Sequence, residues 1–164
     1  MPIHEVVEAL EQLKAHYRNF ANLAEQKKQA LIKNQVDRLT AIVQQESRLI
    51  KQTSVAEQEW MRAASAFLRE NGAHPETAVT MTAIAEMAGE QAQKDKLLRM
   101  RDELLADIKQ LQDYNETNRQ LIEQSLAFVN YSLELLTDSP ENEAFYRHPS
   151  QQAKTQSGIF DRKA

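Results

Sequence analysis

Apolar residues recur along the N-terminal part of the chain at alternating steps of three and four. This is the heptad spacing of helices that pack side by side. The apolar line consists of Ile3, Val6, Leu10, Leu13, Tyr17, Phe20, Ala24 and Leu31, and Lys27 interrupts it. The pattern predicts a helix over residues 3–33 that closes near Asn34, because asparagine tolerates left-handed backbone.

The same spacing resumes after a short joint and predicts a second helix over residues 36–71. Its apolar line consists of Leu39, Ile42, Leu49, Thr53, Ala56, Trp60, Ala63 and Phe67, with Glu46 as a polar layer. So short a joint implies an antiparallel helical hairpin. Aromatic residues at this spacing normally fill a bundle core, so we interpret those of the hairpin as core rather than as a ligand pocket. Gly72 and Pro75 end the helical pattern.

Two further helices are expected beyond Pro75. A short amphipathic helix over residues 76–88 precedes Gly89, and nothing then forbids one continuous helix over residues 90–138. Thr117 and Gln120 match a capping box, which leaves open a kink at Thr117. We interpret Glu46, Asn115 and Asn118 as polar layers that set the register of packing helices.

The predicted fold class is therefore all-α. We expect an elongated antiparallel helical bundle or coiled coil of three long helices plus one short helix, over residues 1–138. The polar segment 139–164 is expected to be a disordered tail. The first two long helices and the first half of the third should pack together, leaving the second half projecting or loosely covered.

Apolar residues after Asn118 exceed what one packing face can bury. At 100° per residue they surround most of the helix. They are Leu121, Ile122, Leu126, Phe128, Val129, Tyr131, Leu133, Leu135 and Leu136. Exposed apolar patches commonly mark a protein partner. A client helix could therefore dock in a groove formed by Leu121, Ile122, Leu126, Val129, Leu133 and Leu136. A homodimer or a fuller intramolecular bundle remains the alternative.

Composition narrows the class of function. The 164 residues include no cysteine, three glycines and four prolines, and the net charge is −4. The lack of cysteine suits a reducing compartment, so we expect a cytoplasmic protein. No signal peptide or apolar membrane span is recognisable. The cations between Lys94 and Arg101 alternate with acidic residues, which does not favour nucleic-acid binding.

No motif points to catalysis. The three glycines form no phosphate-binding loop, and neither Glu-x-x-His nor His-Glu-x-x-His occurs. His4, His16, His74 and His148 are too far apart in sequence to form a local metal-binding pair. We expect no metal, no cofactor and no enzyme activity. A spatially assembled Ser-His-acid site is not excluded by spacing, so an enzyme of the helical-bundle type stays a third hypothesis.

Three segments of the chain resemble the FlgN-type flagellar export chaperones of the type III secretion pathway. The first is Glu25–Lys33 leading into Val36, Leu39 and Glu46, with Asn34-Gln35 where the family often has Gly-Asp. The second is Asn118–Leu126, continuing through Tyr131, Leu133 and Leu136. The third is the tail, where Tyr146 lies near the family's Tyr-Gly-x-x-Gly stretch but lacks its glycines, and where residues 159–164 are similar to a frequent terminal motif.

The resemblance implies a cytoplasmic chaperone that holds the hook–filament junction proteins FlgK and FlgL before export. It implies that the client helix docks on the C-terminal helix. It also implies that the tail, through Phe145 and Tyr146, contacts the export gate protein FlhA.

Overall fold

The computed structural model describes residues 2–137 of the chain. These form four α-helices and no strands, which confirms the predicted all-α class. The helices are α1 (Pro2–Ile32), α2 (Val36–Glu70), α3 (Met81–Met87) and α4 (Gln91–Thr137). The chain divides into two compact units, Met1–Leu121 and Ile122–Ala164.

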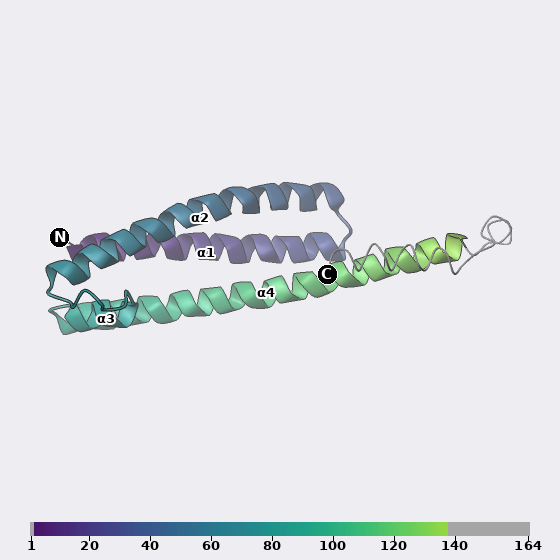
Figure 1. The fold of residues 1–164 in the computed structure, drawn as a ribbon. Helices are drawn as coiled ribbons and strands as arrows, with labels where there is room; N and C mark the ends of the chain where they lie inside the picture. Colours follow the sequence, from purple (N-terminus) through teal and green to yellow (C-terminus); the bar gives the residue numbers. More distant parts are fainter. Residues whose placement is uncertain (1, 138–164) are drawn as a thin grey trace. The chain divides into compact units, whose positions relative to one another are not determined.

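A helical hairpin forms the first part of unit 1. Helices α1 and α2 lie side by side in opposite directions (Figure 1). They are joined at Asn34, whose φ of 55° is left-handed as predicted. The predicted polar interruptions meet at this interface: Lys27 Nζ lies 3.1 Å from Glu46 Oε2, and both side chains are largely buried. The next positions of the two apolar lines, Ala24 on α1 and Leu49 on α2, are also buried.

Helix α4 packs along the other side of α1 within unit 1. Lys14 forms an ion pair with Glu103, and Arg18 Nε lies 3.3 Å from Asp107 Oδ2. Because residue numbers rise together in these two pairs, α4 runs parallel to α1 and antiparallel to α2. The hydrogen bond from Lys14 lowers the pKa of the Glu103 carboxyl, and its positive charge adds to the effect.

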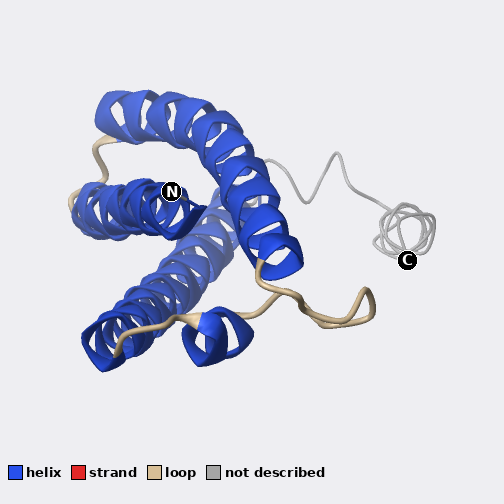
Figure 2. Ribbon diagram, turned by 90° about the vertical axis from the view of Figure 1, so that its left-hand side faces the viewer, coloured by secondary structure: helices blue, strands red, loops and turns tan. Residues whose placement is uncertain are grey.

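The main core lies where the start of α1, the end of α2, helix α3 and the start of α4 meet (Figure 2). Its most completely buried large side chains are Val6, Leu10, Ile84 and Leu97. Burial of one such side chain stabilises a fold by about 1.5–3 kcal/mol. Beyond Leu13 the buried apolar residues of α1 are Ala21, Ala24 and Ala30, and the large buried side chains of this stretch, Ile42 and Leu49, come from α2 alone.

The short third helix differs from its predicted bounds. We expected it over residues 76–88, but α3 begins at Met81. Thr80 has extended backbone, and its side chain accepts a hydrogen bond from the Ala83 amide at 3.1 Å. This is an N-cap, and it places the helix start after residues 76–80. Those residues connect the left-handed Gly72 turn to α3.

Helix α4 is continuous through the polar stretch where a kink was considered. The Thr117 hydroxyl does not cap a new helix. It donates a 3.1 Å hydrogen bond to the Asp113 carbonyl one turn earlier. Such back-bonding satisfies the hydroxyl inside a continuous helix.

Candidate partner-binding site

The described part of unit 2 is the end of α4, residues 122–137. Five aliphatic residues recur on it at steps of four and three, and all five are exposed. We call this set the first stripe: Ile122, Leu126, Val129, Leu133 and Leu136. Leu126 and Leu133 are 58% and 53% exposed, respectively. At 3.6 residues per turn, the set lies within roughly 80° of the helix circumference.

A second set of exposed apolar residues lies on another side of the same helix. This second stripe consists of Phe128, Tyr131 and Leu135, at steps of three and four. It is centred roughly 150° from the first stripe on helical periodicity. These residues belong to the surplus apolar surface predicted from the sequence but not to the predicted docking site. Their own heptad spacing was the signal that separates them from the first stripe.

Leu121 differs from the other residues predicted to bind a client. It belongs to unit 1 and is half-buried. On helical periodicity it lies about 100° from Ile122, which places it nearer the second stripe. The structure therefore groups five of the six predicted residues and separates the sixth. The predicted gate-contact residues Phe145 and Tyr146 lie outside the described residues.

The last buried contact of unit 1 is made by Asn118. Its side-chain Nδ2 donates a 2.8 Å hydrogen bond to the Ala24 carbonyl in α1. Asn118 is 3% exposed, and its Oδ1 atom has no hydrogen-bond partner. Asn115, the other predicted polar layer on this helix, is exposed. Asn118 is thus a buried polar contact of the kind that fixes helix register, and Asn115 is not.

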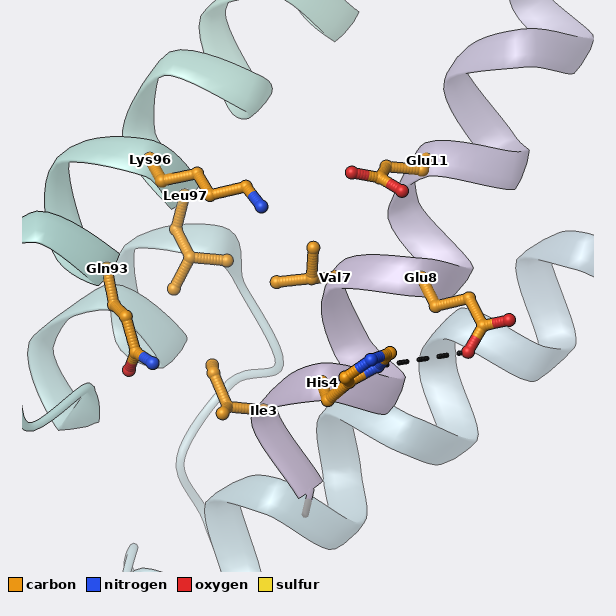
Figure 3. Close-up of a pocket in the computed structure, with 8 residues that line it drawn as sticks. All are labelled: Ile3, His4, Val7, Glu8, Glu11, Gln93, Lys96 and Leu97. Carbon is orange, nitrogen blue, oxygen red and sulfur yellow. Dashed lines mark ion pairs between the residues drawn. The ribbon is translucent and has the colours of Figure 1, made fainter.

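An open groove of about 470 Å³ lies between the starts of α1 and α4. Figure 3 shows its lining residues: Ile3, His4, Val7, Glu8, Glu11, Gln93, Lys96 and Leu97. Apolar side chains line its middle, and both signs of charge line its rim. His4 Nδ1 is 3.9 Å from Glu8 Oε2. Because the rim carries both signs of charge, it favours neither an anionic nor a cationic ligand. The sequence could not reveal the groove, because it depends on how α1 and α4 are aligned.

The histidines and aromatic residues within residues 2–137 form no arrangement typical of a catalytic site. His4 lies at the groove, His16 is half-buried on α1, and His74 Nδ1 accepts a bond from the Glu76 amide. His148 lies outside the described residues. Phe67 is buried and Trp60 packs against the main core, as predicted. Across residues 2–137 no group of three or more His, Asp or Glu side chains could hold a metal ion.

Tyr17, in the hairpin, has a raised pKa. The Tyr17 hydroxyl lies 3.0 Å from Glu57 Oε1 on α2. Partial burial raises the pKa of Tyr17, and the hydrogen bond and negative charge of Glu57 raise it further. The contact ties α1 to α2 and involves no other titrating partner, which favours a structural role.

None of the four described helices combines the length and apolar content that crossing a bilayer requires. The chain is 26% identical over 142 residues to the uncharacterized protein YvyG of Bacillus subtilis (strain 168). The match covers 87% of this chain and 85% of that protein. No solved structure matches this chain.

The family comparison covers nearly the whole chain. The model of the FlgN protein family matches residues 1–154, which include both units of the described structure. The all-helical fold and the apolar end of α4 agree with the resemblance found in the sequence. The chain therefore belongs to the FlgN family, a family of flagellar export chaperones.

Proposed function

We propose that this chain is a cytoplasmic chaperone that binds the hook–filament junction proteins FlgK and FlgL and protects them before export. The observation that carries this proposal is the first stripe, five exposed aliphatic residues in one line on α4. A helix face of this kind matches the amphipathic helix of a partner, with anchors at steps of three and four. Family membership supplies the class of client.

The edges of the first stripe suggest which client helices fit. Ser125 and Ser132 lie along one edge and allow close approach of a second helix. Glu123 and Glu134 lie along the other. A client helix with lysine or arginine on the facing edge would place opposite charges together, which favours association rate and orientation. Packing of the client's helix against the first stripe would also cover the client's own assembly surface and so prevent premature polymerisation.

The test uses two substitutions within the first stripe. Leu126→Glu combined with Leu133→Glu should weaken FlgK capture at least about 100-fold, since buried interface anchors each contribute about 2 kcal/mol or more. Circular dichroism should stay helical because both residues are exposed. Unchanged capture would refute the proposal.

Leu135→Glu is the matched control. Leu135 lies on the same helix and is as exposed as Leu126, at 58%, but it belongs to the second stripe. The control should leave capture nearly unchanged. Light scattering of the unmodified chain addresses the alternative, a homodimer through the first stripe. A dimer that Leu126→Glu with Leu133→Glu abolishes, without any client binding, would favour that alternative.

The tail is proposed to contact the export gate protein FlhA through Phe145 and Tyr146. Polar residues flank these two aromatic residues on both sides, and a second apolar pair, Ile159 and Phe160, follows near the end of the segment. Removal of residues 140–164 should leave FlgK binding intact and weaken binding to FlhA. Equal FlhA binding by the truncated chain would contradict this assignment.

A further inference from the structure

Helix α2 carries a second apolar face that its packing against α1 does not use. Val36, Val43 and Ile50 recur every seven residues, and their side chains are 70%, 43% and 58% exposed. At 3.6 residues per turn they lie roughly 110° from the face that α2 presents to α1. We call this line and the small residues between its members the α2 face.

Small hydroxyl residues alternate with the large ones on this face. Thr40, Ser47 and Ser54 each follow a large residue by four positions. Two of the hydroxyls are already bonded within the helix: Thr40 donates to the Val36 carbonyl and Ser47 to the Val43 carbonyl, both at 3.0 Å. A hydroxyl that has its bond inside the helix can be buried without leaving an unsatisfied donor. These positions are therefore suited to close approach of another helix.

The alternation makes the α2 face complementary to itself. If two copies of α2 lie antiparallel, a single register places all three large residues opposite small ones. Val36 then faces Ser54 of the second copy, Val43 faces Ser47, and Ile50 faces Thr40. A twofold axis generates each contact twice, as an isologous interface requires. Large residues opposite small ones interdigitate at protein density.

Charge along one edge of the face agrees with the same register. Asp37 and Lys51 lie on the same side of the exposed line. A twofold axis perpendicular to the helices brings these equivalent edges together, so that Asp37 of one copy meets Lys51 of the other. Among the ion pairs of the described residues, neither takes part in one. Two symmetric ion pairs would then flank the apolar contacts.

We propose that two copies of this chain associate through the α2 face, antiparallel and with Val43 packed against Ser47 of the second copy. This inference is independent of the proposed function, because it uses residues of α2 and none of the first stripe. The dimer would hold two client-binding helices in one particle. The interface involves one helix per copy, so it belongs to the small class of interfaces, below about 1,200 Å².

Sedimentation equilibrium over a concentration series tests the proposal with the full chain. The unmodified chain should show a monomer–dimer equilibrium. Val43→Glu combined with Ile50→Glu should raise the dissociation constant at least about tenfold, the effect of 1.4 kcal/mol. Leu105→Glu is the control, because Leu105 is 57% exposed on α4 and lies off the α2 face. A chain that stays monomeric up to high micromolar concentration would overturn the proposal.

A charge exchange tests the register without touching the apolar residues. Asp37→Lys should weaken the dimer, and Asp37→Lys combined with Lys51→Asp should restore it to near the original affinity. Failure of the double variant to recover, with both variants folded, would overturn the antiparallel register. Leu126→Glu with Leu133→Glu should leave the dimer intact. Loss of the dimer in that variant would place the interface on α4 instead.

Discussion

Lys27 and Glu46 occupy the one charged position in each apolar line of the hairpin, and their side chains meet at 3.1 Å across the interface. Each residue interrupts a heptad pattern that is otherwise apolar or small. Because the two interruptions coincide, neither charge is buried alone. The pair also fixes the alignment of α1 and α2, since a shift by one heptad would place each charge against apolar side chains.

Removal of one member of this pair should destabilise the fold more than removal of both. Lys27→Leu or Glu46→Leu alone should lower the free energy of unfolding by about 1–3 kcal/mol, because the remaining charge stays largely buried. The double variant should return to within about 1 kcal/mol of the original chain or exceed it. Urea denaturation measures all three. The Lys109–Asp113 pair, which is well exposed, is the control and should contribute less than about 1 kcal/mol.

Asn118 should tolerate a neutral apolar replacement better than a charged one. Asn118→Asp removes the donor to the Ala24 carbonyl and buries a carboxylate beside it, so it should cost about 2–3 kcal/mol at pH 7. Burial would raise the pKa of the introduced carboxyl. Its unfavourable effect should therefore shrink as the pH falls and the acid form can donate to Ala24.

Asn118→Leu should cost less than Asn118→Asp at pH 7. The leucine loses the 2.8 Å bond, but it also removes the Oδ1 atom that has no partner. Urea denaturation of both variants at pH 7 and pH 4.5 gives the comparison. A loss of stability in Asn118→Asp that does not change with pH would contradict this account of the site.

Ionisation of the Tyr17 hydroxyl should destabilise the fold at high pH. Its pKa is raised in the folded chain, so folding favours the protonated hydroxyl. The stabilisation is complete below the unfolded-state pKa of about 10 and is lost as the pH rises through the folded-state value. Tyr17→Phe should reduce the dependence of unfolding free energy on pH above 10. Tyrosinate absorbance provides a second measurement of the same titration.

Leu10 should be a critical residue of the main core. It is 1% exposed, and truncation of a buried leucine to alanine typically costs about 2–5 kcal/mol. Leu105→Ala is the matched control because Leu105 is 57% exposed, and its effect should stay within about 0.5 kcal/mol. Similar losses from both variants would mean that the core is not where the structure places it.

The bounds of the long helices could be predicted from the sequence because their signals are local. Heptad spacing determined the packing faces of α1 and α2, and the left-handed residue Asn34 determined the joint. The predicted start of α3 was wrong. The Thr80 side chain accepts a hydrogen bond from the Ala83 amide and so caps the helix, which competes with helix formation in residues 76–80. Hydrophobic spacing alone does not report that bond.

Features that depend on how helices distant in sequence align with one another could not be predicted from the sequence. The groove at Val7 and Leu97 requires the parallel packing of α1 and α4, which no local pattern encodes. Part of the partner-binding site could be predicted from the sequence, because the apolar residues from Ile122 to Leu136 recur at steps of three and four. Leu121 was grouped with them by hydrophobicity, and only its angular position and partial burial separate it.

The uneven core of unit 1 has a consequence for local opening. Large side chains from four helices are buried together around Leu10, whereas beyond Leu13 helix α1 buries only alanines and the large buried side chains come from α2 alone. Backbone amides near Leu10 and Ile84 should therefore exchange with solvent deuterium only through global unfolding. Amides near Asn34 should exchange through smaller and more frequent openings, so the hairpin should loosen first from its connecting turn.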